Sequence, residues 1–373
     1  MSESIPEEQY EPSPELIERV LKLPCDNCGG QFVYSAQKQL LECKHCGNTS
    51  DFNKANDQVK ELSLEEGIQK AESYNPTATG NKAIHCDSCG SDLIVEADQV
   101  SVRCDFCGSE RINEVAFDRN IIRPQGIIPF KIPKKDAAEK FRTWIKKGWF
   151  HPNKLKKLAA LGEVHGIYVP FWTFDAKTHS DWSGQAGYYY YETQTYSSGG
   201  ETKTRQVRKT RWVSRRGSFS KDFDDILVVA SKGLPHKIIT KIYPFALEEV
   251  INYDPQVMLG WDCEVYSLEV NEGYEIADKK MDEALKSQAK RACGGDTQRF
   301  LKVYSQKWGQ TFKHIILPVW LCSYMYNNKS YQFAVNGQTG TINGKKPLSW
   351  IKITLFVLFV LGVIVAIAVF TNQ

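Results

Sequence analysis

Eight of the eleven cysteines fall into two groups with the same spacing, and this repeat constrains the fold more than any other feature. Each group has two Cys-x-x-Cys pairs separated by fourteen residues, and the group that begins at Cys86 repeats the one that begins at Cys25. Four thiolates carried on two tight turns supply the ligands of a tetrahedral zinc site. The predicted ligands of two structural Zn²⁺ ions are Cys25, Cys28, Cys43, Cys46, Cys86, Cys89, Cys104 and Cys107.

Short strand patterns between the cysteine pairs indicate a zinc ribbon at residues 23–50 and another at 83–112. Glycine follows the second and fourth cysteine of each group, as a turn with positive φ requires. Redox activity is the alternative for a Cys-x-x-Cys pair, but no βαβ pattern surrounds either pair. Four thiolates also leave no open position for catalysis. The expected strands are Gln31–Tyr34, Gln39–Glu42, Leu93–Val95 and Val100–Arg103.

The segment between the ribbons, residues 51–82, is predicted to be a helix followed by flexible chain. Ser63 and Glu66 form a capping-box pattern near the start of the expected helix Leu62–Tyr74. Asn75 and Pro76 then end it. A connection of this kind does not fix the orientation of the two ribbons.

The C-terminal segment Ile353–Phe370 contains eighteen residues without a charge, which is long enough to cross most of a bilayer. Trp350 and Lys352 extend it with an interfacial ring and a cation. A buried core helix is the alternative, but core helices are rarely apolar on every face. We therefore expect a transmembrane tail anchor at residues 350–370.

The charges that flank this segment predict its orientation. Lys345, Lys346 and Lys352 precede the span and no charge follows it. By the positive-inside rule the bulk of the chain then lies in the cytoplasm, on a single-pass anchor in the inner (cytoplasmic) membrane. That compartment is reducing, which favours metal ligands over disulfides. Residues 1–22, with six glutamates and three prolines, are expected to form an acidic disordered arm.

Residues 121–347 are expected to form a β-rich α+β domain, since aromatic and β-branched residues dominate them. Two similar segments, Tyr168–Trp172 and Leu317–Trp320, are predicted to be related central strands. The expected helices are Pro133–Lys147, Asn153–Leu161 and Ile276–Arg291. The expected strands are Ile167–Ala176, Gly184–Thr195, Arg205–Ser214, Cys263–Val270, Ile315–Tyr326 and Ser330–Val335.

Positive charge is concentrated on one expected strand, which belongs to a long hairpin. Five of its cations have odd numbers, so on a strand they share one face. Such a row attracts anionic lipid, an acidic partner or nucleic acid; a solvated face on an exposed hairpin is the alternative. Because the chain is expected to be tethered at a membrane, we favour lipid or an acidic protein over nucleic acid as the ligand of this row. The five cations are Lys203, Arg205, Lys209, Arg211 and Arg215.

The sequence contains no phosphate-binding loop, metalloprotease motif or nucleophile elbow. The cysteines outside the two groups, Cys263, Cys293 and Cys322, have no histidine at a catalytic spacing. We therefore expect a protein that is not an enzyme.

Besides the cysteines, four segments carry a resemblance to a known family: Gly166–Ala176, Asp224–Ser231, Leu259–Trp261 and Phe333–Gly340. With them the chain resembles bacterial double-zinc-ribbon, C-terminally membrane-anchored proteins, often labelled as relatives of primosomal helicase (replication factor Y). The domain between the ribbons and the anchor is too short to hold the two ATPase lobes of a helicase. The helicase label would therefore rest on the ribbons. The resemblance implies an adaptor found with SPFH-domain and phage-shock-type proteins.

Two functions of different classes follow. The first is a membrane-anchored cytoplasmic adaptor whose ribbons recruit a protein partner, for example in envelope-stress or membrane-organisation assemblies. The second is a membrane-tethered nucleic-acid-binding or replication-associated protein that uses the ribbons and the basic hairpin. The ribbons favour the first, since residues 86–107 hold one cation, Arg103, against five acidic side chains.

Overall fold

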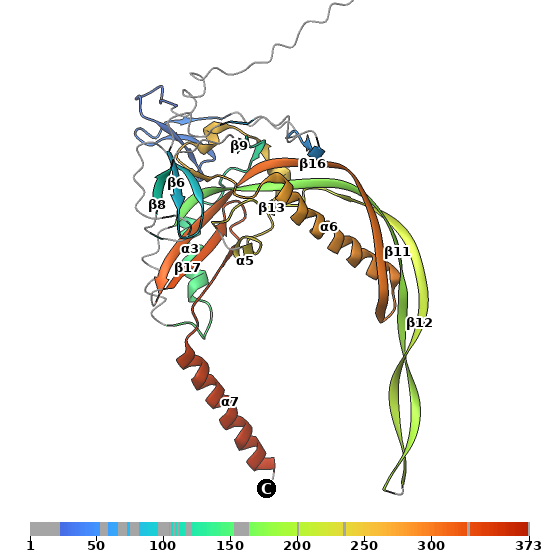
Figure 1. Cartoon of the computed structure of the whole chain (residues 1–373). Helices are drawn as coiled ribbons and strands as arrows, with labels where there is room; N and C mark the ends of the chain where they lie inside the picture. The colour runs from blue at the N-terminus through green and yellow to red at the C-terminus, as the bar shows by residue number, and fades with distance from the viewer. Residues whose placement is uncertain are drawn as a thin grey trace, which may run out of the picture.

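Two very long antiparallel strands form the centre of this α+β fold, β11 (His165–Ser198) and β16 (Thr297–Tyr326). They pair from His165 opposite Leu321 to Gly187 opposite Thr297, with two register shifts. The computed structural model shows them as an arch that leaves the body of the protein (Figure 1). It describes residues 23–52, 59–65, 73–74, 82–95, 104, 106, 109, 112–115, 121–152, 164–199, 201–233, 236–326 and 329–371.

The two similar segments noted in the sequence lie side by side in this pair. Val169 is opposite Leu317, and Pro170 is opposite Ile316. Both faces of β11 are covered here, because Tyr168 packs into one hydrophobic cluster while Val169 and Phe171 pack into another. Burial on both faces explains why this stretch is apolar without alternation.

The free end of the arch is a hairpin. β12 (Glu201–Phe223) pairs with β11 from Ala176 to Ser198, so the hairpin continues beyond the last residue of β11 that pairs with β16. The expected strands Ile167–Ala176 and Gly184–Thr195 are thus parts of one strand. We call the part of the hairpin beyond Gly187 the arm (Figure 1).

Helices lie beside the sheet or extend from the body. α3 (Lys134–Lys146) and α6 (Val270–Cys293) confirm the helices expected at these positions, although α6 begins at Val270 and not at Ile276. α6 lies along the concave side of the arch (Figure 1) and turns Ala277, Met281, Leu285, Ala289 and Cys293 inward at four-residue spacing. α7 (Trp350–Thr371) leaves the body on its own.

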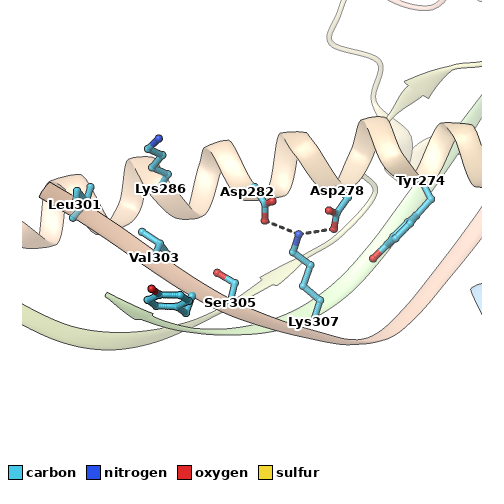
Figure 2. A pocket seen from close by; sticks show the side chains of 9 residues that line it. Tyr274, Asp278, Asp282, Lys286, Leu301, Val303, Ser305 and Lys307 are labelled. Carbon is cyan, nitrogen blue, oxygen red and sulfur yellow. Dashed lines mark hydrogen bonds and ion pairs between the residues drawn. The ribbon is translucent and has the colours of Figure 1, made fainter. Parts of the chain in front are cut away.

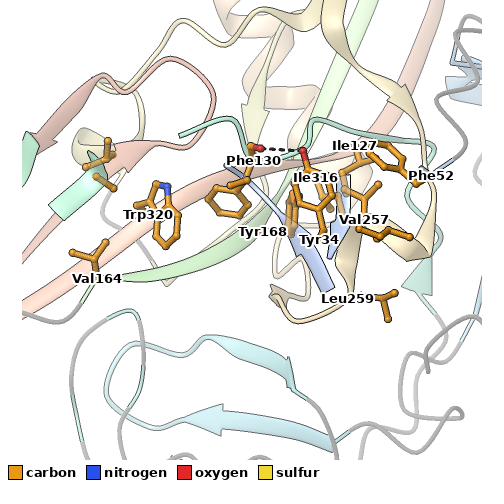
Figure 3. Packing of buried hydrophobic residues seen from close by; sticks show 14 of the residues in the cluster. Tyr34, Phe52, Ile127, Phe130, Val164, Tyr168, Val257, Leu259, Ile316 and Trp320 are labelled. Carbon is orange, nitrogen blue, oxygen red and sulfur yellow. Dashed lines mark hydrogen bonds between the residues drawn. The ribbon is translucent and has the colours of Figure 1, made fainter. Parts of the chain in front are cut away.

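The first cysteine segment packs against the body. Its strands β1 (Phe32–Ser35), β2 (Leu40–Cys43) and β3 (Thr49–Ser50) form a small sheet. The Tyr34 hydroxyl donates to Phe130 O at 3.1 Å, the Tyr34 amide donates to Leu259 O at 3.1 Å, and Trp261 Nε1 donates to Tyr34 O at 3.0 Å. Figure 3 shows Tyr34 in a cluster of buried hydrophobic residues that also contains the rings of Phe130 and Tyr168.

The second cysteine segment joins the main sheet directly. β7 (Asp92–Val95) pairs with β6 (Lys82–Cys86) on one side and with β15 (Asp262–Glu264) on the other. β15 in turn runs parallel to β11. The orientation of both segments is therefore set by contacts with the body, which the sequence did not indicate.

The remaining elements complete the sheet and its covering. Within the described residues, thirteen strands form the main sheet. The other elements are β4 (Leu62–Ser63), β5 (Ser73–Tyr74), β8 (Ile112–Val115), β9 (Ile121–Ile122), β10 (Gly126–Ile127), β13 (Val228–Val229), α5 (His236–Ile239), η1 (Leu247–Glu249), β14 (Ile251–Asn252), η2 (Pro255–Met258), β17 (Lys329–Asn336) and β18 (Ile342–Gly344).

One local prediction was wrong, and another holds only in part. The expected helix Leu62–Tyr74 has a short strand at each end, because Leu62 pairs with Phe312 and Ser73 with Ile122, but Leu64 and Glu65 are helical. Residues 66–72 lie outside the described residues. The expected strand Cys263–Val270 stops at Glu264, and Val270 already starts α6. At Leu62 and Ser73, pairing with distant residues outweighs the local pattern. The expected arm 1–22, strand Val100–Arg103 and helix Asn153–Leu161 lie outside the described residues.

Glu264 sits where the second cysteine segment meets the body, and it gives a prediction about pH. Burial raises the pKa of this carboxyl to about 8. The Gly233 amide donates to its Oε1 at 3.3 Å, and Oε2 is buried without a hydrogen bond. The folded chain therefore holds a proton that the unfolded chain loses near pH 4.3.

Stability should accordingly fall as the pH rises from about 5 to about 8, by up to about 1.4 kcal/mol per pH unit. The variant Glu264→Gln should lose this pH dependence of stability. Thermal unfolding of wild type and variant at several pH values measures the difference. Glu275→Gln, on the exposed side of α6, is the matched control and keeps the wild-type slope. Equal slopes for wild type and Glu264→Gln would contradict the assignment.

Candidate metal centres, membrane helix and arm

The first cysteine cluster has the geometry of a four-sulfur metal site. The Sγ atoms of Cys25, Cys28, Cys43 and Cys46 all lie within 4.8 Å of one another. Cys25 Sγ is 3.6 Å from Cys46 Sγ, and Cys28 Sγ is 3.5 Å from Cys43 Sγ. Zinc–sulfur bonds of about 2.3 Å in a tetrahedron place the sulfurs about 3.8 Å apart. The cluster could therefore hold a metal ion of this kind.

Amide groups beside this cluster favour the thiolate form of Cys46, which is the form that binds metal. Hydrogen bonds from the Asn48 backbone amide and the Asn27 side chain lower the pKa of the Cys46 thiol to about 6. Gly29 and Gly47 have φ of +70° and +73°, as the two tight turns require. Cys25 and Cys43 are buried, whereas Cys28 and Cys46 are exposed at the tips of the turns.

Three ligands of the second cluster lie in the described part of the chain. Cys86, Cys89 and Cys104 bring their Sγ atoms within 4.8 Å of one another, and Cys89 Sγ is 3.7 Å from Cys104 Sγ. Cys107 lies outside the described residues. Phe106 next to this cluster is buried in the body, and Gln332 Nε2 donates to its carbonyl at 2.6 Å. This cluster could also hold a metal ion.

The cysteines outside the clusters are packed into the fold. Cys322 and Cys293 are buried in hydrophobic clusters, and Cys263 is partly buried in β15. Burial raises the pKa of the Cys263 thiol. A raised thiol pKa disfavours the nucleophilic thiolate, so the environment of Cys263 fits a structural role.

α7 is a candidate membrane span. The window Trp350–Ile367 has a mean hydropathy of 2.7, and none of it is buried against the rest of the protein. A soluble core helix would be covered by other elements. Composition and exposure together make α7 the one candidate span among the described residues.

The five cations predicted to share a face do lie on one side of the hairpin, four of them on the arm and Arg215 just before it, opposite Gly184. The strand register places Lys203, Lys209 and Arg211 opposite Tyr196, Tyr190 and Tyr188, and side chains of opposed residues lie on the same face. Lys209 forms an ion pair with Glu192. Arg215 donates to the Tyr188 hydroxyl at 3.0 Å. One face of the arm therefore alternates cations with tyrosines.

Exposed aromatic residues along β16 were missed by the sequence reasoning. Phe300, Tyr304 and Trp308 recur every fourth residue and are 71%, 70% and 48% exposed. The spacing is visible in the sequence, but this part of β16 was not predicted to be a strand. Cations lie over rings nearby: Arg299 of β16 is 4.0 Å from the Trp212 ring, and Arg208 of β12 is 4.3 Å from the Tyr189 ring.

Charged groups between α6 and β16 surround a cavity of about 620 Å³ (Figure 2). Lys307 Nζ lies 2.5 Å from Asp278 Oδ1 and 2.6 Å from Asp282 Oδ1. These bonds attach the helix to the arch. A second acidic group, Glu61 with Asp175 and Asp224, lies beside Lys313, which pairs with Glu61 at 3.2 Å. Both sets of carboxylates thus have a lysine within ion-pair distance.

Comparison with known proteins gives one informative similarity. The chain is 26% identical over 334 residues to a protein of Bacillus subtilis (strain 168) described as uncharacterized protein YdjG, covering 88% of this chain and 91% of that protein. No family model matches the chain. No solved structure matches it either. The similarity to the Bacillus protein covers nearly the full length of both chains, so it extends well beyond the cysteine motifs.

The two clusters give a prediction about metal content and stability. The purified chain should carry about two zinc ions, and Cys28→Ser should carry about one, because three thiolates hold the metal far more weakly. Cys25 and Cys43 share a hydrophobic cluster with Phe130 and Tyr168, so metal loss should also lower the melting temperature of the body.

Elemental analysis and calorimetry on the same samples measure both effects. Cys263→Ala is the control, because Cys263 belongs to neither cluster. It should retain two zinc ions per chain. Full zinc content in Cys28→Ser, or zinc loss without any change in melting temperature, would contradict the prediction.

Proposed function

We propose that the chain is a membrane-anchored, zinc-binding adaptor that holds a protein partner at the cytoplasmic face of the inner membrane and catalyses no reaction. One observation carries this proposal: both cysteine clusters are fastened to the same body that ends in the exposed apolar helix α7. A rigid body with surface knuckles and a membrane anchor presents a docking surface at a fixed place.

The knuckles of the first cluster supply that surface in the proposal. Residues 26–29 and 44–49 are exposed at the tips, although the opposite side of the same segment is buried against the body. Zinc holds such turns in one conformation, so a partner meets a preformed surface. The family resemblance noted above suggests SPFH-domain or phage-shock-type proteins as partners.

The adaptor proposal predicts that changes at the tips remove the partner without removing zinc. Lys44→Glu with His45→Glu alters exposed, non-ligating side chains. Crosslinking in native membranes followed by affinity capture should recover at least about fivefold less partner than wild type, which corresponds to about 1 kcal/mol of binding free energy.

Lys135→Glu on the exposed side of α3 is the control, since it reverses one charge away from the cluster. It should recover the partner at the wild-type level. An identical set of captured proteins from wild type and the tip variant would refute the recruiting role of the first ribbon.

A second candidate, binding of single-stranded nucleic acid, has support from the arm. Cations interleaved with exposed aromatic rings are the usual surface for stacking bases and pairing phosphates. Arg205 lies 5.6 Å from the Tyr196 ring, and Arg208 lies over Tyr189. Glu192 offsets the charge of one of the five cations, Lys209.

This candidate predicts binding that weakens steeply with salt. Neutralising Arg205 and Arg211 to glutamine should reduce the slope of log K against log salt by about 1.4, because each phosphate contact contributes about 0.7 for a single strand. Fluorescence anisotropy with a labelled oligonucleotide measures the slope. Binding that is absent, or insensitive to salt, eliminates the candidate.

A further inference from the structure

A second cavity, of about 390 Å³, lies where the body meets the first turn of α7. Its lining comes from the end of α3, from the loop Gly148–Pro152 and from Lys352 of α7. Because the candidate span starts at Trp350, this cavity lies at the level of the lipid headgroups if α7 crosses the bilayer.

The loop that forms the cavity is fixed to the start of α7. The Ser349 amide donates to Phe150 O at 2.7 Å, and Lys352 Nζ donates to His151 O at 2.8 Å. The His151 ring nitrogen Nδ1 lies 2.8 Å from Pro347 O, so Nδ1 carries the proton of this bond. Phe150 also meets Phe356 edge-on at 5.2 Å. Loop and helix therefore hold the cavity in one shape.

Gly148 permits the close approach that shapes this loop. Its φ is +111°, and a Cβ there would lie 2.4 Å from the His151 ring. Other residues would strain the backbone and push the histidine away. The backbone of the loop is therefore fixed in the conformation that shapes the cavity.

The chemistry of the lining is cationic and aromatic. Lys146 and Lys352 line it, and none of the described lining residues is an acid. Trp149 is 81% exposed and Trp350 79%, at the depth where indole rings favour the membrane interface. Lys346 donates to Trp144 O at 2.6 Å at the end of α3. Basic pockets at the membrane surface bind lipid phosphates.

We propose that this cavity binds the headgroup phosphate of an anionic phospholipid, with Lys146 and Lys352 as the cationic contacts. The inference rests on the proposed membrane anchor and adds a specific lipid site to it. A bound lipid joins α3 and its loop to α7, and so fixes the body at a set distance from the bilayer. A soluble phosphate has the same chemistry, and the experiment separates the two.

The test uses the full-length chain in nanodiscs that contain phosphatidylcholine and phosphatidylglycerol. Native mass spectrometry after release from the nanodiscs measures how much phosphatidylglycerol stays bound. Lys146→Gln should retain about fivefold less of this lipid, as expected for one cation at a lipid surface. Lys146→Arg, which keeps the charge, should retain it.

Lys147→Gln is the matched control, because it removes a neighbouring exposed charge that does not line the cavity. It should bind phosphatidylglycerol as wild type does. Equal retention in Lys146→Gln and Lys147→Gln would overturn the site. Displacement of the lipid by millimolar inorganic phosphate would overturn the lipid as the ligand. Failure of wild type to enter nanodiscs would instead contradict the membrane anchor itself.

Discussion

The pairing of β11 with β16 is the constraint on which the rest of the structure depends. The ladder continues from His165 to Gly187 along β11, and side chains from both faces of this strand are buried near Pro170. Several parts of the fold attach to this pair: α6 along the arch, β12 at the free end, and β15 beside Ile167. Residues far apart in sequence are held together by it.

The cysteine segments are structural parts of this frame. The first contributes Tyr34 to the ring cluster around Phe130 and Tyr168, and the second contributes β7 to the sheet through β15. Cysteine turns and core residues share short strands, so a metal bound at the cysteines would also stabilise the body. The turn tips of the first segment are exposed, while its opposite side is buried against the body.

Local patterns in the sequence predicted the elements that depend on local interactions. The cysteine spacing predicted the first cluster, the apolar spacing predicted α3 and α6, and the uncharged C-terminal run predicted α7. They did not predict that one strand would join Ile167 to Thr195, because the polar residues between do not form a simple alternation. Features that arise from long-range contacts could not be predicted either. Leu62 belongs to a strand because it meets Phe312, and no residue near Leu62 in the sequence signals that partner.

In the proposed arrangement, four thiolates and no other ligand hold each metal, in a body anchored at the membrane. X-ray absorption at the zinc edge, measured on the full-length chain in isolated membranes, identifies these ligands. We expect about four sulfur neighbours per zinc at about 2.3 Å. A shell of nitrogen or oxygen ligands at the shorter distances typical of those atoms, or no zinc in the membrane-bound chain, would contradict it.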